Sequence, residues 1–114
     1  MHLDLRYFNS ITEEDMELKI KMMRIMLDET PDELEKLRKY TDEKNWDLVR
    51  AIAHKMKSSM QFLGLKETLD NVKSVELYAK EMKNLELIPE KVSRVEQDCR
   101  QALIALQEEL EKIQ

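Results

Sequence analysis

Apolar residues recur every three or four positions through most of this chain, which is the spacing that places side chains on one face of an α-helix. The clearest stretch runs from Val49 to Leu63. Its apolar positions are Val49, Ile52, Ala53, Met56, Met60 and Leu63. At about 100° per residue these side chains fall within one arc. The pattern therefore predicts a helix that buries one face and leaves the other in water.

The same spacing predicts five helices in all. They are expected at residues 12–28, 31–43, 46–63, 66–84 and 89–113, after an irregular lead-in over residues 1–11. Four long amphipathic helices with short connections favour an antiparallel up-down four-helix bundle. The helix over residues 12–28 is expected to pack across one end as an additional N-terminal helix. The whole chain, residues 1–114, is predicted to be one domain.

Residues that favour helix ends support these boundaries. Thr12 is a good N-cap for the first helix. The segment Thr30–Glu33 resembles a capping box with Pro at the first helical position, which predicts a break between the first two helices. Asn45 can cap the third helix, and Gly64 fits the left-handed position that ends it. Pro89 opens the last helix.

The composition supports an all-α class. The chain holds 1 Gly and 2 Pro among 114 residues, which is too few for the turns that several strands and hairpins require. A single Gly also excludes a glycine-rich phosphate loop, so the sequence offers no means of binding ATP by itself. With 42% hydrophobic residues, the chain has enough apolar side chains for a core.

Charge and cysteine content narrow the function classes. The net charge of −5 argues against nucleic acid as a partner, because phosphate backbones attract basic surfaces. The chain lacks the run of about 18 apolar residues that membrane insertion needs, and its charged start does not resemble a signal peptide. Cys99 is alone, so no disulfide framework is expected, and it cannot complete a zinc site with His54. These features predict a cytoplasmic domain without a metal of its own.

His54 lies nearly opposite the centre of the apolar arc in the third predicted helix, where a histidine has no packing reason to be. Its neighbours on the polar face, at i−4, i+3, i+4 and i+7, are Arg50, Lys57, Ser58 and Gln61. Two cations and a small hydroxyl around an exposed imidazole suggest a site that handles an anionic phosphate. A neutral imidazole can attack an acyl phosphate and carry the phosphoryl group as a phosphoramidate.

Each neighbour has an expected role in such a reaction. Lys57 would balance the negative charge on the transferring oxygens, and Gln61 would hydrogen-bond the phosphoryl group or the ring. Ser58 is small and leaves room for a second protein to reach the histidine, and Arg50 is a further candidate for partner binding. The site has no general base or phosphate loop, so the partner must bring the aspartate and the Mg²⁺. The sequence therefore predicts a transfer module with no bound cofactor.

A second apolar side of the helix predicted at residues 12–28 is a candidate docking surface. This side consists of Leu18, Met22 and Ile25. The roughly opposite side, which is expected to face the core, consists of Met16, Ile20, Met23 and Leu27. A helix that is apolar on two sides either lies deep or offers one side to a partner. The side formed by Leu18, Met22 and Ile25 is therefore expected to bind the receiver protein that reacts with the histidine.

The segment His54–Ser59, HKMKSS, followed by Leu63 and Gly64, resembles the histidine-containing phosphotransfer (HPt) domain. The pattern usual in that family is His-x-Leu-Lys-Gly-Ser/Ala, with Leu-Gly several residues on. The resemblance extends over almost the whole chain. It implies a four-helix bundle, phosphorylation of His54 with Lys57 as the supporting cation, and receiver domains of response regulators as partners.

Two positions differ from the usual pattern of that family. Met56 stands where Leu is usual, a conservative exchange at a core position. Ser58 stands where Gly is usual, and it keeps the position small. The resemblance thus predicts a histidine phosphocarrier that accepts a phosphoryl group from a receiver-domain aspartate and passes it to a response regulator.

Two alternatives stay open at this point. The dimerisation helices of an autophosphorylating kinase usually carry an acidic residue directly after the histidine and a Thr-Pro nearby, whereas Lys55 follows His54 here and no Pro is close. The second alternative is a non-catalytic helical adaptor that binds receiver domains or other helical partners. A monomer is expected, because one site on one bundle suffices. The chain is either a separate protein or part of a hybrid sensor histidine kinase.

Overall fold

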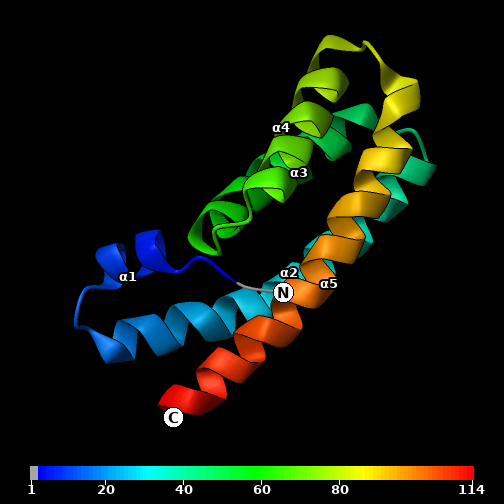
Figure 1. Cartoon of the computed structure of the whole chain (residues 1–114). Coiled ribbons are helices and arrows are strands. Elements are labelled where there is room, and N and C mark those ends of the chain that lie inside the picture. Colours follow the sequence, from blue (N-terminus) through cyan, green and yellow to red (C-terminus); the bar gives the residue numbers. More distant parts are fainter. Residues whose placement is uncertain (1–2) are drawn as a thin grey trace.

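The computed structural model describes residues 3–114, which form five α-helices and one short 3-10 helix (Figure 1). The elements are α1 (Arg6–Thr12), α2 (Met16–Asp42), α3 (Trp46–Phe62), α4 (Lys66–Glu81), η1 (Leu85–Leu87) and α5 (Ile88–Ile113). No strand occurs among these described residues. The predicted all-α class is therefore confirmed.

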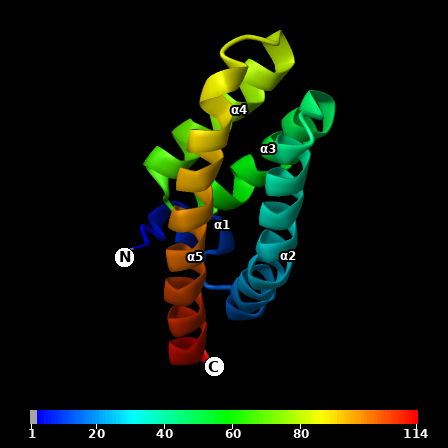
Figure 2. The ribbon, with the colours of Figure 1, turned by 90° about the vertical axis from the view of Figure 1, so that its right-hand side faces the viewer.

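Four of the helices, α2 to α5, pack together as a bundle. Each contacts the next one along the chain, and α2 also contacts α5, so the four helices close into a ring. Short connections reverse the chain between consecutive helices, as Figures 1 and 2 show. Helix α1 packs against α2 and α3. The α3–α4 pair and the α2–α5 pair form opposite sides of the ring.

Helix α2 is continuous, whereas the sequence predicted separate helices at residues 12–28 and 31–43. The predicted break at Pro31 does not occur, and Thr30 is buried inside the helix instead of capping it. The buried positions keep helical spacing through the proline, and they are Met23, Met26, Thr30, Glu33, Leu34, Leu37 and Thr41. Burial along this unbroken stripe holds both halves of the helix against the bundle. It outweighs the hydrogen bond that Pro31 cannot donate.

Pro31 nevertheless affects the direction of α2. A proline inside a helix removes the bond to the carbonyl four residues earlier and crowds that carbonyl, which bends the helix. Figure 1 shows that the first part of α2 runs in a different direction from the second part, which lies along α5. The expected separate helix over residues 12–28 is thus replaced by the first part of a longer, bent helix.

The additional N-terminal helix is α1. The prediction of an irregular lead-in over residues 1–11 is therefore wrong from Arg6 onward. Residues 1 and 2 lie outside the described part of the chain. Thr12 ends α1 instead of capping the next helix, and its buried hydroxyl donates to the Phe8 carbonyl at 3.0 Å. The N-cap of α2 is Asp15, whose carboxylate accepts from the Leu18 amide at 3.0 Å. Phe8 is fully buried in the core. Burial of the Phe8 ring orders the backbone around it, and this segment is helical instead of irregular.

Both predicted ends of α3 are confirmed. The Asn45 side chain accepts from a first-turn amide at 3.3 Å, and Gly64 has a left-handed φ of +66° just after the helix. The Leu65 amide donates to the Met60 carbonyl at 3.0 Å, and the Gly64 amide donates to the Gln61 carbonyl at 3.1 Å. These two bonds form the Schellman motif, which ends a helix and turns the chain sharply. The motif determines where α4 starts relative to α3.

Gly64 also permits a close approach of the segment that precedes α1. A Cβ on this residue would lie 2.5 Å from the Asp4 Cβ and would overlap the Asp4 carbonyl oxygen. Asp4 is paired with Arg6, whose Nη2 lies 2.7 Å from the Asp4 Oδ2. The backbone at Asp4 therefore covers the turn between α3 and α4 directly.

Gly64→Ala is expected to destabilise the protein by more than about 1 kcal/mol, because it combines a strained left-handed backbone with the overlap on Asp4. Chemical denaturation measures the effect. Gly64→Asn is the matched control, since Asn tolerates the left-handed region better but brings the same Cβ. It should also be destabilised, though by less. If Gly64→Asn is as stable as the original protein, the contact with Asp4 does not matter.

The end of the fourth helix lies three residues earlier than the predicted residue 84. Helix α4 ends at Glu81, and Met82 and Asn84 take left-handed conformations with φ of +55° and +54°. Met82, the residue directly after α4, is 59% exposed. The left-handed turn ends the helix before this last apolar position can join the core.

The core consists of Phe8 and the apolar stripes of the four bundle helices. The buried stripe of α5 has helical spacing and consists of Val92, Val95, Cys99, Ala102, Leu106 and Leu110. Cys99 is a small buried hydrophobe in this stripe. Burial raises its pKa to about 12, and its Sγ lies 3.6 Å from the Met60 sulfur.

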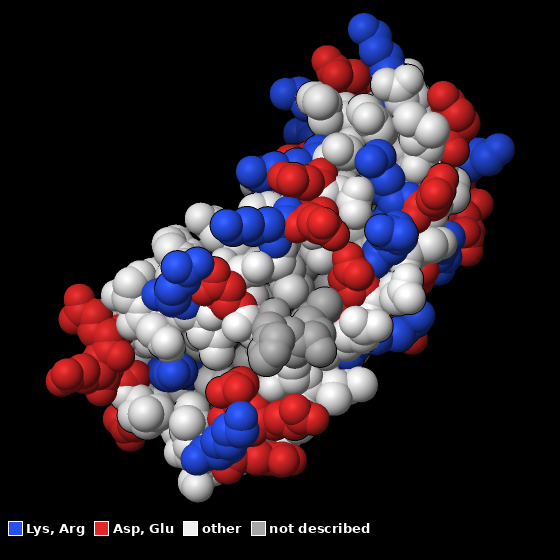
Figure 3. All heavy atoms as spheres, in the orientation of Figure 1, with Lys and Arg blue, Asp and Glu red and all other residues white. Residues whose placement is uncertain are grey.

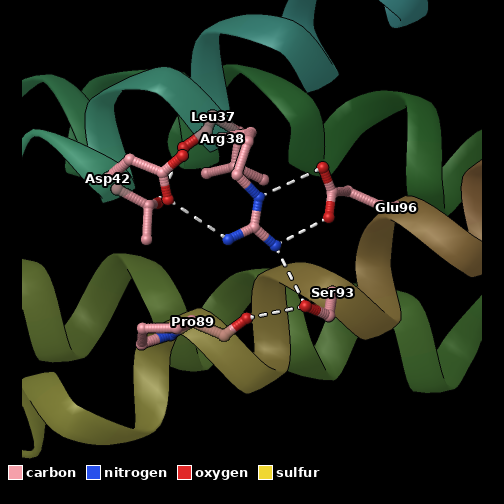
Figure 4. A network of polar contacts seen from close by, with 7 residues as sticks. Leu37, Arg38, Asp42, Pro89, Ser93 and Glu96 are labelled. Carbon is pink, nitrogen blue, oxygen red and sulfur yellow. Dashed lines mark hydrogen bonds and ion pairs between the residues drawn. The ribbon is translucent and has the colours of Figure 1, made fainter.

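Arg38 joins α2 to α5 on the side of the ring opposite α3 and α4 (Figure 4). Its guanidinium donates to both carboxylate oxygens of Glu96, at 2.7 and 3.3 Å, and to the Ser93 hydroxyl at 3.0 Å. Ser93 itself donates to the Pro89 carbonyl at 3.1 Å. A two-pronged contact between arginine and a carboxylate fixes direction as well as distance. This group therefore sets how α2 lies on α5.

Glu33 is a charged residue within the buried stripe of α2. Its side chain is 7% exposed, and it pairs with Lys55 of α3, whose Nζ lies 3.7 Å from the Glu33 Oε2. Burial raises the pKa of Glu33, and the opposing effect of Lys55 is smaller. Water weakens this ion pair because most of the Lys55 side chain is exposed. The folded protein therefore holds a proton on Glu33 to a higher pH than the unfolded chain does.

Glu33→Gln is expected to raise the melting temperature at pH 7 by a few degrees. Since the folded-state pKa lies above the ordinary value of 4.5, the stability that Glu33 contributes is complete below that value and is lost as the pH rises through the folded-state pKa. A neutral side chain avoids this loss, so melting curves should also depend less on pH above 4.5. Lys55→Gln is the control, and it should lower the melting temperature at pH 7. A Glu33→Gln variant that melts below the original protein at pH 7 contradicts this account.

Candidate functional site

His54 projects from the middle of α3 into solvent, as its position on the helix predicts. Its side chain is 70% exposed, while Ala53 and Met56 beside it are completely buried. The buried residues hold α3 against the core. The imidazole is therefore presented to the outside from a rigid backbone.

A carboxylate from the neighbouring helix anchors the ring. Nδ1 of His54 lies 2.5 Å from Oε2 of Glu76 on α4. The second oxygen of the same carboxylate, Oε1, accepts from the Lys57 ammonium at 2.8 Å. One carboxylate therefore connects the imidazole to the cation, and α3 to α4.

The Glu76 carboxylate is negatively charged in this setting. Its side chain is 19% exposed, and this burial acts to raise its pKa. The hydrogen bonds from Lys57 and His54 act in the opposite direction and prevail, so the pKa of Glu76 lies below its usual range. An ionised carboxylate only accepts hydrogen bonds.

An acceptor at Nδ1 determines which ring nitrogen can react. Because Glu76 accepts, Nδ1 of a neutral His54 ring carries the proton. Nε2 then has a free lone pair and no contact with Glu76. The ring can therefore attack an electrophile through Nε2 without a base that first removes a proton.

The site lies on an open surface and not in a cavity that encloses a small substrate. A hollow of about 1100 Å³ lies between α2 and α5, on the opposite side of the ring, and neither His54 nor Glu76 lines it. An exposed nucleophile of this kind fits an electrophilic atom that a second macromolecule presents. The arrangement suits a carrier that completes its reaction centre with a partner protein.

The sequence model of the Hpt domain family matches residues 21–114. The chain belongs to the Hpt domain family. Hpt domains carry out histidine phosphotransfer in phosphorelays, where they interact with receiver domains and act as phosphocarriers, not as kinases. Searches of curated proteins and of solved structures gave no match. The matched residues include all of α3 and α4, and with them His54, Lys57 and Glu76.

Of the residues that the sequence predicted to surround His54 in this Hpt domain, some lie beside the ring and others do not. Lys57 lies beside His54 and shares the Glu76 carboxylate with it. Arg50 and Ser58 are exposed one turn before and one turn after His54 on α3. Among the described residues, neither side chain forms a hydrogen bond with the ring, whose partner is Glu76.

Gln61 does not make the ring hydrogen bond that the sequence analysis considered for it. It is exposed, but it lies two turns from His54, a rise of about 10 Å along the helix. It lines a separate hollow together with Tyr7 and Leu69. The contact to the ring is made by Glu76 instead.

The predicted docking residues of α2 are only partly together on the surface. Leu18 and Ile25 are exposed, at 39% and 43%, and line a shallow hollow on α2 with charged neighbours. Met22 is partly buried and packs against the core. Residues of α2 and its N-cap form this hollow, and no residue of α3 contributes to it.

Glu76 is the site residue to which the sequence analysis assigned no role. A signal for it exists in the spacing around the turn between α3 and α4. His54 stands ten residues before Gly64 and Glu76 stands twelve residues after it. Two antiparallel helices joined by a tight turn bring residues at similar distances from that turn side by side. The carboxylate opposite His54 could have been found from this register.

Other ligands find little support in the described residues. Figure 3 shows Lys and Arg interspersed with Asp and Glu on one face, without a continuous basic stripe. Residues 3–114 contain no group of three or more His, Cys, Asp or Glu side chains that could hold a metal ion. None of the helices in this part of the chain is long and apolar enough to cross a bilayer.

Proposed function

We propose that this Hpt domain carries a phosphoryl group on Nε2 of His54, taking it from the aspartate of one receiver domain and passing it to a response regulator. The observation that supports this proposal is the exposed imidazole whose Nδ1 is held by Glu76 at 2.5 Å. A ring anchored at one nitrogen offers the other nitrogen to a partner in a fixed orientation.

The ring neither gains nor loses a proton during the proposed transfer step. The Nε2 lone pair attacks the phosphorus of the aspartyl phosphate, and a P–N bond forms. The P–O bond to the aspartate breaks, and its electron pair leaves with the carboxylate. Nδ1 keeps its proton, so the product is a phosphorylated imidazolium that faces the Glu76 carboxylate.

Lys57 is the proposed source of positive charge on this side of the reaction. Its ammonium lies one turn from His54 and is held near the ring by Glu76 at 2.8 Å. From there it can approach the phosphoryl oxygens as negative charge develops on them. The receiver domain brings the second cation, a Mg²⁺ bound by its own carboxylates.

Access to Nε2 depends on the surface beside His54. Ser58, one turn after the histidine, is small and leaves space for the receiver. Arg50, one turn before it, offers a further positive charge to the acidic receiver site. The exposed apolar residues of α2, Leu18 and Ile25 with Met22 beneath them, are the proposed docking contact.

The phosphoryl group originates outside this domain, since Hpt domains are phosphocarriers. A hybrid sensor histidine kinase, fused to the chain or separate from it, is the proposed source. The cytoplasm, where such kinases meet ATP, is the proposed location. A monomer suffices, because the imidazole, the cation and the anchoring carboxylate all belong to one bundle.

Phosphotransfer can be tested with a panel of receiver domains phosphorylated by acetyl phosphate in the presence of Mg²⁺. The domain should acquire an acid-labile, base-stable label, and His54→Gln should abolish it. Lys57→Gln should slow labelling roughly ten- to hundredfold. This effect is smaller than that of removing a fully buried hydrogen-bond donor, because water screens the partly exposed Lys57.

Labelling that survives in His54→Gln contradicts the assignment of that residue. Label gained from ATP alone would favour a kinase, and binding without label would favour an adaptor.

The docking contact has a separate test. Leu18→Asp and Ile25→Asp should slow transfer from the receiver about tenfold while the melting temperature stays unchanged, because both side chains are exposed. Ile104→Asp is the matched control, since Ile104 is 64% exposed on α5 and lines the hollow on the opposite side of the ring. Equal transfer rates in all three variants and the original protein would remove the α2 surface from the proposal.

A further inference from the structure

We propose that Glu76 keeps the phosphorylated ring of His54 protonated at Nδ1, so that this domain carries its phosphoryl group in the form from which the group leaves readily. This inference rests on the proposed function. Once the phosphoryl group has arrived, Glu76 acts as a positioning residue that sets the lifetime of the phosphorylated intermediate.

The proton matters because it decides what leaves when the P–N bond breaks. If Nδ1 carries a proton, the electron pair of the P–N bond returns to Nε2 and a neutral imidazole departs. If Nδ1 has lost its proton, the same step must release an imidazolate anion, which is a far poorer leaving group. The proton on an isolated imidazolium is lost to water near neutral pH. A phosphohistidine without a partner therefore becomes inert as the solution turns alkaline.

The geometry at His54 opposes this loss. The ionised carboxylate of Glu76 lies 2.5 Å from Nδ1 and is mostly buried, so its attraction for a positively charged ring is screened less than at an open surface. In a neutral ring this contact selects the tautomer with the proton on Nδ1. After phosphorylation it faces a ring with a full positive charge, and the same contact becomes a charged pair.

Cations on α3 and α4 act in the opposite direction to Glu76. On α3, Arg50 and Lys57 lie one turn before and one turn after His54, and on α4, Lys73 and Lys80 lie one turn on either side of Glu76. All four are cations, and they disfavour a positive ring. Lys57 also competes directly for the Glu76 carboxylate. Glu76 is therefore the group that must hold the proton.

Replacing the carboxylate of Glu76 with an amide separates its two roles, which are the hydrogen bond to the ring and the negative charge beside it. In Glu76→Gln the amide oxygen can still accept from Nδ1, so the ring keeps its orientation. The negative charge is gone, however, so the phosphorylated ring loses its proton at a lower pH. The proposal therefore predicts that the charge of Glu76, and not merely its hydrogen bond, makes the intermediate reactive.

The experiment uses the intact chain and needs no receiver domain. Potassium phosphoramidate, which phosphorylates histidine directly, labels His54 in the original protein and in Glu76→Gln. Phosphorus NMR then follows the decay of the phosphohistidine between pH 6 and pH 9, and nitrogen NMR of the ring reports the proton at Nδ1. The midpoint of the decay profile should lie about one pH unit higher in the original protein, which means roughly tenfold faster decay at pH 8.

Two further variants complete the comparison. Glu76→Ala should shift the midpoint at least as far as Glu76→Gln, and thermal melting shows that each variant is folded. Glu108→Gln, an exposed residue of α5, is the control and should leave the profile unchanged. Equal midpoints and equal ring protonation in the original protein and Glu76→Gln overturn the role of Glu76 alone. A failure of phosphoramidate to label His54 overturns the proposed function as well.

Discussion

The carboxylate of Glu76 is the contact on which the rest of the site depends. It accepts from the imidazole through one oxygen and from the Lys57 ammonium through the other. A phosphocarrier needs a histidine that a second protein can reach, yet an exposed side chain ordinarily turns freely. Anchoring one edge of the ring resolves this conflict, because the opposite edge stays open while its direction is set. The same contact holds the Lys57 ammonium close to the ring.

This contact requires a defined register between α3 and α4. A shift of one residue in α3 would turn His54 by about 100°, and the same shift in α4 would turn Glu76, so either shift would separate the carboxylate from the ring. The Schellman motif at Gly64 and Leu65 sets the register, and the backbone of Asp4 covers the turn. On the opposite side of the ring, Arg38 fixes α2 on α5. The conformation of one glycine thus bears directly on the contact between His54 and Glu76.

Sequence reasoning succeeded where one helix determines the outcome by itself. The exposed face that bears His54, the helix end at Gly64 and the stripe of α5 follow from spacing along a single segment. It failed where contacts between distant segments decide. Pro31 predicted a break, but burial on both sides of it keeps α2 continuous. The short helix Arg6–Thr12 forms because the core receives one of its side chains. Glu76 belongs to the site only once α4 lies beside α3.

The segment before α2 is a structural part of this Hpt domain, although the family match starts at residue 21. The Phe8 ring is completely buried, and its centroid lies 6.0 Å from that of Phe62 at the end of α3. A truncated form that begins at the family boundary would leave a hole in the core at this point and would admit water to the turn at Gly64. Phe8 therefore supplies part of the core behind α3 from upstream of the region shared with the family.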